Sequence, residues 1–144
     1  MIIVSACLAG VNCRYDGKNS ALGQIREMVR SGRALPVCPE QLGGLPTPRL
    51  PSEIHGGDGM DVLAGRAGVF NSAGEDATAA YLKGSREVLK IAGLVSAREA
   101  VLKDRSPACG AGFICRDGKP VSGAGVCAAM LIKGGVGVRG SGEI

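Results

Sequence analysis

The first 38 residues hold two short apolar runs with an amphipathic segment between them, and this pattern restricts the fold more than any other feature. Ile2–Ser5 and Ala34–Val37 are apolar, and they predict two buried strands. The segment between them predicts a helix that opens at Ser20 and ends at Gly32, a left-handed C-cap. Two strands joined by one crossover helix in so short a stretch pair in parallel, with a right-handed connection. The sequence therefore predicts an α/β fold.

The rest of the chain continues this alternation after one long interruption. Residues 39–61 are rich in proline and glycine, and they predict a long ordered loop of the kind that carries function. Residues 61–63 and 68–70 predict a small hairpin. Further helices are expected at 75–93 and 121–133, and further strands at 100–102 and 136–138. We expect a single compact domain over residues 1–144, with a small, mainly parallel central sheet flanked by helices.

Composition and charge exclude several functional classes. The formal net charge is +4, the Lys and Arg residues are scattered, and the chain has only two Phe, two Tyr and no Trp. Nucleic-acid binding is not predicted from this charge, because such grooves need clustered basic residues and stacking aromatics. The N-terminus has no basic leader and no apolar run approaches the ~18 residues of a membrane span, so the chain is predicted to be soluble and cytoplasmic. Nothing in the sequence indicates an oligomeric state.

Three cysteines occupy equivalent topological positions. Cys7 and Cys38 directly follow the first two predicted strands, and Cys109 lies a few residues past the third. Ligands of open parallel sheets bind at the carboxyl edge of the strands, where loops leaving adjacent strands splay apart. Single free cysteines are often buried in a core, but three at one sheet edge favour coordination of a metal or cluster.

The other three cysteines have different expected roles. Cys13 shares a loop with Cys7 and is an additional candidate ligand or redox neighbour, whereas Cys115 and Cys127 are predicted to lie in the core. No C-x-x-C pair exists, so zinc-ribbon, ferredoxin and thioredoxin spacings are all absent. The fold itself must assemble the ligands.

Polar residues near the cysteines complete the candidate site. Glu40 and Asp16 are carboxylates that could reach the same edge, where one could act as a general base, or they could be solvated loop charges. Ser106 precedes Cys109 by three residues and is either a hydrogen-bond donor at the site or a turn residue. Arg49 is predicted to be solvated rather than directed at an anion, and His55 is predicted to lie at the surface.

Three successive motifs resemble the 2-thiouracil desulfidase family, a family whose function was formerly unknown. The motifs are SACLAG (5–10) with RYDG (14–17), PVCPE (36–40) with GGLPTPR (43–49), and LK (102–103) with SPACG (106–110). The resemblance implies a 4Fe-4S cluster held by Cys7, Cys38 and Cys109, with the fourth iron open to the sulfur of the substrate. It places the functional glutamate and serine of the family on Glu40 and Ser106.

The implied reaction is a non-redox, hydrolytic desulfuration of a small thiolated base, 2-thiouracil to uracil plus sulfide. Glu40 would activate water, while Ser106 and Asp16 would orient the substrate. The chain departs from the family pattern at Ala108, where a serine is expected, and at Cys13. The alternative is a non-catalytic zinc- or thiol-binding module that uses the same cysteines, with Cys13 or a water as fourth ligand.

Overall fold

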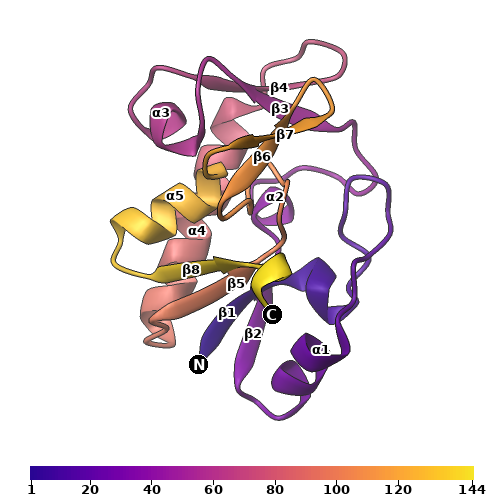
Figure 1. Cartoon of the computed structure of the whole chain (residues 1–144), viewed down its shortest axis with the longest axis vertical. Helices are drawn as coiled ribbons and strands as arrows, with labels where there is room; N and C mark the ends of the chain where they lie inside the picture. Colours follow the sequence, from indigo (N-terminus) through magenta and orange to yellow (C-terminus); the bar gives the residue numbers. More distant parts are fainter.

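A four-stranded parallel sheet forms the centre of the computed structural model, which describes residues 1–144 (Figure 1). Its strands run in the order β2-β1-β5-β8, and each neighbouring pair is parallel. The predicted α/β fold with a small parallel sheet is therefore confirmed. The strands are β1 (Ile2–Ser5), β2 (Ala34–Val37), β5 (Glu99–Leu102) and β8 (Gly137–Gly140).

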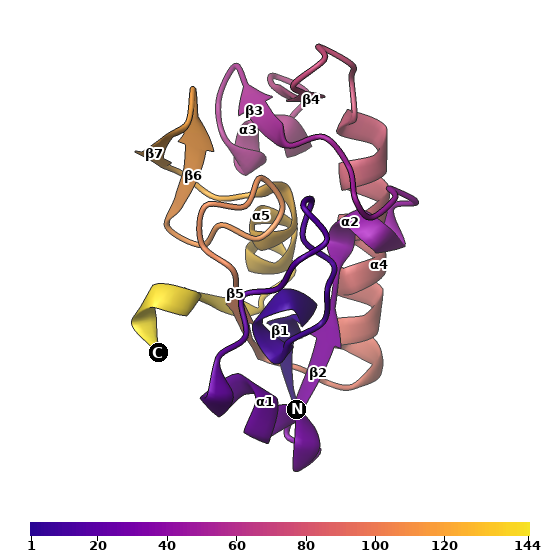
Figure 2. The ribbon, with the colours of Figure 1, turned by 90° about the vertical axis from the view of Figure 1, so that its right-hand side faces the viewer.

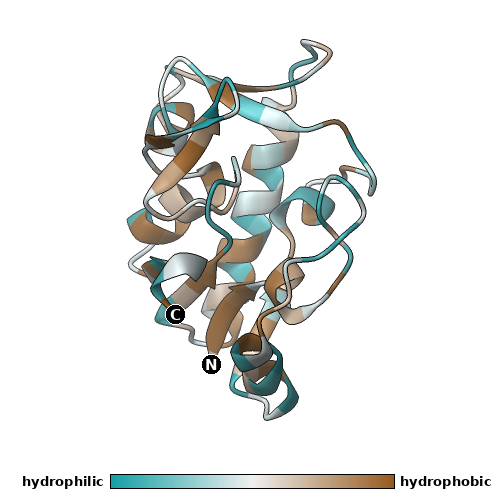
Figure 3. Cartoon of the chain, turned by 45° about the vertical axis from the view of Figure 1, so that its right-hand side comes forward, coloured by the Kyte–Doolittle hydropathy of each residue, from teal (hydrophilic) through white to brown (hydrophobic).

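Helices cover both faces of this sheet, because the strand side chains alternate between two cores. Ile3 and Leu102 belong to the larger core, which includes buried residues of three helices, while Val4 and Val101 pack with Ile25 in the smaller core. Figure 2 shows α4 and α1 on opposite sides of the sheet, and Figure 3 shows a hydrophobic β1 beside an α1 of mixed hydropathy. The helices are α1 (Gly23–Arg30), α4 (Thr78–Leu94) and α5 (Val126–Lys133). No helix is both long enough and apolar enough to span a membrane.

Smaller elements lie beyond the carboxyl edge of the sheet (Figure 1). Two antiparallel hairpins are joined there, because the Glu53 carboxylate accepts hydrogen bonds from the backbone N–H groups of Asp117 and Gly118, at 2.9 and 3.1 Å. The short elements are η1 (Ala6–Ala9), α2 (Pro39–Leu42), β3 (Ser52–His55), α3 (Gly59–Leu63), β4 (Gly68–Asn71), β6 (Phe113–Arg116), β7 (Lys119–Ser122) and η2 (Ser141–Glu143).

The predictions for residues 39–70 are partly wrong. The predicted loop contains α2, which opens with Pro39 at its first position, and β3. Residues 61–63 belong to α3, whose N-cap Asp58 forms a capping box with Asp61, so the hairpin partner of β4 is β3. The capping residues outweigh the weak strand pattern of this segment.

The helix predicted at 121–133 begins later, because its first residues form a strand. Asp117 and Gly118 both have positive φ, 52° and 75°, as a two-residue type I′ hairpin turn requires. This turn pairs β6 with β7, and the helix starts only at Val126. The Asp-Gly pair is a strong hairpin signal in the sequence. The other two predicted helices also start late, α1 at Gly23 and α4 at Thr78.

Gly84 of α4 is required for close packing between α4 and α2. A Cβ at this position would collide with the Pro39 carbonyl oxygen and would lie 3.0 Å from the Gly43 nitrogen. Gly84→Ala is therefore expected to lower the free energy of unfolding by about 1 to 3 kcal/mol, despite the better helix propensity of alanine. Urea unfolding followed by circular dichroism measures the change.

Gly93 provides the matched control in the same helix. A Cβ at Gly93 would meet nothing within 4 Å, so Gly93→Ala is expected to be neutral or stabilising. Equal stability of the two variants would contradict the steric argument. Because α2 begins next to Cys38 and contains Glu40, this contact also positions part of the site.

Candidate functional site

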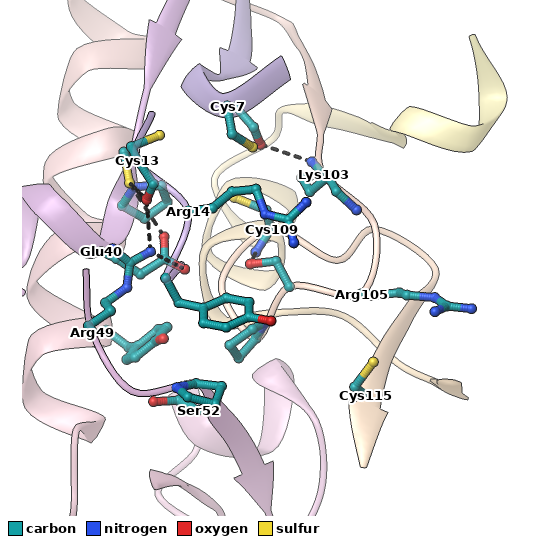
Figure 4. Close-up of a pocket in the computed structure, with 18 of the residues that line it drawn as sticks. Cys7, Cys13, Arg14, Glu40, Arg49, Ser52, Lys103, Arg105, Cys109 and Cys115 are labelled. Carbon is teal, nitrogen blue, oxygen red and sulfur yellow. Dashed lines mark hydrogen bonds and ion pairs between the residues drawn. The ribbon is translucent and has the colours of Figure 1, made fainter. Parts of the chain in front are cut away.

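A cavity of about 480 Å³ lies at the carboxyl edge of the parallel sheet (Figure 4). Three predicted ligands line it from three elements: Cys7 from η1 after β1, Cys38 from the end of β2, and Cys109 from the loop after β5. Glu40 and Ser106 line it as well. The fold thus brings five of the six sequence-predicted site residues to one cavity.

Asp16 is the exception. Its carboxylate is exposed and outside the cavity lining; it pairs with the Arg14 guanidinium at 3.4 Å and accepts a hydrogen bond from the Lys18 backbone N–H at 3.0 Å. Arg14 itself lines the cavity. Asp16 therefore faces a neighbouring cation rather than the cavity.

The loop that carries Cys109 is fixed by Ser106. The Ser106 hydroxyl oxygen accepts hydrogen bonds from the backbone N–H groups of Ala108 and Cys109, at 3.1 and 3.0 Å. The next turn is bonded to α5, since the Cys127 N–H donates to the Ala108 carbonyl at 2.8 Å. Cys109 therefore sits on a loop that is tied to the core.

Ser106 also acts on Glu40: burial raises the pKa of this carboxyl, and the Ser106 side chain is among the groups that oppose the rise. The Ser106 oxygen already accepts two backbone N–H groups, so its own proton is available to a nearby acceptor. The Cys38 thiol donates to the same carboxylate, with 3.7 Å between Sγ and Oε1. These contacts connect the loops after β2 and β5 across the cavity.

Glu40 is buried beside Arg49, which contradicts the prediction of a solvated arginine. Only 7% of Glu40 is exposed, and an Arg49 Nη lies 3.8 Å from its carboxylate oxygen. Arg49 also donates to the Cys13 carbonyl at 3.0 Å. Burial raises the pKa of Glu40, and the positive charge of Arg49 opposes this rise. The guanidinium thus compensates a carboxylate that would otherwise be buried without an opposite charge.

The thiols of Cys7, Cys13 and Cys38 are neighbours. Cys13 is buried, and its thiol hydrogen-bonds with both Cys7 and Cys38. The hydrogen bond to Cys38 lowers the pKa of Cys13, but the bond to Cys7 and burial outweigh it and raise this pKa to about 11. The hydrogen bond that Cys38 donates to Cys13 and burial raise the pKa of Cys38, and burial raises that of Cys109. Binding of iron by Cys38 and Cys109 therefore has to displace thiol protons.

Ser5 lines the cavity and interacts with Cys109. The serine is 2% exposed, its hydroxyl oxygen accepts the Lys103 backbone N–H at 2.9 Å, and it hydrogen-bonds with the Cys109 thiol. Hydrogen bonds of this type orient ligands and tune the sulfur of a bound cluster. Ser5 belongs to the first motif, but its support of Cys109 depends on a contact between distant residues, which no local sequence pattern indicates.

The structure also corrects or extends other expectations. Cys115 was predicted to lie in the core, but it is half-buried and lines the cavity; Cys127 is fully buried and His55 is exposed, as predicted. Tyr81 lines the cavity from α4 and hydrogen-bonds with Ser52, and burial raises its pKa. Sequence reasoning missed Tyr81, because its helical spacing also fits a plain core position.

The donor set is of the kind that an iron–sulfur cluster needs, with thiols on several sides of one cavity. Zinc needs four ligands within about 2.0–2.3 Å of one point, and no group of three or more His, Cys, Asp or Glu side chains is placed to hold a metal ion in this structure. An iron–sulfur cluster instead needs thiolates distributed around a body of several atoms. Thiols from three separate elements around one cavity meet that requirement.

Comparison with known proteins agrees with this donor set. The chain is 44% identical over 147 residues to the uncharacterized protein YbbK of Bacillus subtilis (strain 168), covering all of this chain and 97% of that protein. Its fold matches that of the [4Fe-4S]-dependent thiouracil desulfidase TudS with a TM-score of 0.87 and 36% identity, over 99% of this chain and 91% of the other. The model of the 2-thiouracil desulfurase family matches residues 2–141. The resemblance carried by the three motifs is thereby confirmed, and the chain belongs to the 2-thiouracil desulfurase family.

Proposed function

We propose that the protein is an iron–sulfur-dependent desulfidase that hydrolyses the thiocarbonyl of 2-thiouracil, giving uracil and hydrogen sulfide. Water supplies the oxygen and both hydrogens that balance the reaction, so no electron donor is needed. One observation carries the proposal: three thiols from separate strand ends share a cavity with a buried carboxylate. The family assignment and the similarity to TudS support it.

Cys7, Cys38 and Cys109 would hold the cluster. When bound through only three cysteines, a 4Fe-4S cluster supplies one iron with an open position, a Lewis acid for the thiocarbonyl sulfur. The remaining cavity wall belongs to Glu40, Arg49, Ser106 and their neighbours, which face the space left for a small planar base.

Glu40 is the proton acceptor in this proposal. It takes a proton from the attacking water and returns it to the departing sulfur, and Arg49 compensates its charge at 3.8 Å. Ser106 would donate a hydrogen bond to the carboxylate and so fix its orientation. Asp16 does not contact the substrate in this proposal. It acts through Arg14, with which it forms an ion pair.

Anaerobically reconstituted protein is expected to convert 2-thiouracil to uracil with release of one sulfide per uracil and no added reductant. Chromatography of the pyrimidines and a colorimetric sulfide assay measure the two products. Iron and acid-labile sulfide are determined on the same preparation, with cluster-free protein as the control. One equivalent of zinc without sulfide, and no uracil formed, would favour the non-catalytic metal-binding alternative.

A further inference from the structure

Tyr15 is an aromatic side chain held at the cavity without being part of the core. It is 43% exposed and lines the cavity. The chain has only four aromatic residues, and the other one in the lining, Tyr81, is 2% exposed on α4. Tyr15 is therefore the one accessible aromatic surface of the cavity.

Backbone hydrogen bonds hold the loop of Tyr15 in place. The Arg49 N–H donates to the Tyr15 carbonyl at 2.8 Å, which joins this loop to the segment that also supplies the ion pair to Glu40. Within the loop, the Gly17 N–H donates to the Arg14 carbonyl at 2.9 Å, and the Arg14 N–H donates to the Lys18 carbonyl at 3.2 Å. The ring thus has a fixed attachment although few side chains pack around it.

Arg14 fixes one side of the ring. Its guanidinium carbon lies 5.9 Å from the Tyr15 ring centroid, within the range of a cation–π contact. The guanidinium is itself held by the Ser20 hydroxyl at 2.8 Å and by Asp16 at 3.4 Å. A cation over one face of an aromatic ring leaves the other face free for a planar ligand.

We propose that Tyr15 is the platform on which the pyrimidine ring of the substrate stacks, with Arg14 and Asp16 bracing it. This inference rests on the proposed function and assigns a binding determinant to the same cavity. Stacking needs only a flat π-face, so it contributes to binding of both thiouracil and uracil. A group that holds substrate and transition state equally raises affinity but leaves the chemical step unchanged.

The test compares Tyr15→Phe with Tyr15→Leu in the cluster-loaded protein. Leucine has no π-face, and loss of one stacked base is expected to raise KM for 2-thiouracil by about 5- to 150-fold, with kcat changed by less than about threefold. Phenylalanine keeps the ring and is expected to leave KM within about twofold. Val11→Ala serves as a control, because Val11 is 45% exposed in the same region but outside the cavity lining.

Binding of uracil provides a second readout that needs no turnover. Equilibrium dialysis with labelled uracil is expected to show the same order: wild type and Tyr15→Phe bind alike, and Tyr15→Leu binds more weakly. If uracil binding follows this order while 2-thiouracil is not converted, stacking on Tyr15 is supported and the proposed reaction is wrong. If wild type converts 2-thiouracil and Tyr15→Leu keeps its KM and uracil affinity, the platform is wrong and the reaction stands. Loss of iron in Tyr15→Leu would also overturn the proposal, because Tyr15 would then act on the cluster loop.

Discussion

Replacement of Cys7, Cys38 or Cys109 by alanine is expected to abolish the binding of iron and acid-labile sulfide, and with it all desulfidase activity. Each thiol comes from a different element at the sheet edge, so no neighbouring residue on the same loop can replace Cys109. Each variant would leave only two of the three cysteine thiolates to bind the cluster. Metal analysis and the absorption spectrum after anaerobic reconstitution measure the loss.

The remaining cysteines provide matched controls. Cys115 lines the same cavity and Cys127 is buried in the core, and alanine at either position is expected to leave the cluster in place. A full cluster in Cys38→Ala would overturn the ligand assignment.

Cys13→Ala separates two arrangements of the thiols. Cys13 contacts Cys7 and Cys38, so it stands within reach of a cluster that those residues hold. In the three-ligand proposal its replacement leaves iron content and turnover in place. Loss of iron in this variant would make Cys13 a ligand and would remove the open iron on which the proposed reaction depends.

The sequence predicted the part of the site that follows from strand topology. Cys38 comes directly after β2 and Cys7 two residues after the end of β1, so the parallel pairing of these strands brings them to one edge without further information. Glu40 lies two residues after Cys38, so its place at the same edge is predicted with that of Cys38. The periodicity that defines the strands therefore also places these side chains.

Contacts between distant loops could not be predicted in the same way. Arg49 pairs with Glu40 only because the segment after α2 folds back onto the loop of Cys13 and Tyr15. A local pattern around Arg49 shows an arginine between prolines, which is equally typical of an exposed loop. By contrast, the Asp-Gly turn between β6 and β7 could have been predicted from the sequence. Its recognition would have placed Cys115 on a hairpin rather than in the core.

Glu40→Gln is expected to lower kcat for 2-thiouracil by roughly 10²- to 10⁴-fold while iron and sulfide content stay unchanged. This range is typical for the loss of a positioned proton-transfer group. Glutamine has nearly the same shape and can still accept the hydrogen bond from Ser106, but its amide cannot take a proton from water. Arg49 keeps its bond to the Cys13 carbonyl in the variant, so the loop beside the proposed cluster ligands stays attached. Ser106→Ala is a less specific test, because it also removes the acceptor for the Cys109 N–H.

Glu53→Gln is the matched control for Glu40→Gln. Glu53 is a second carboxylate of the cavity lining, but its two oxygens are occupied by the N–H groups of Asp117 and Gly118. Glutamine retains one acceptor oxygen for these groups, and turnover is expected to stay within a few-fold of wild type. Both variants remove one negative charge from the same cavity, so a general electrostatic effect would lower both rates alike. A large loss in Glu40→Gln alone identifies proton transfer at this carboxylate, whereas wild-type turnover with an intact cluster would exclude Glu40 from the reaction.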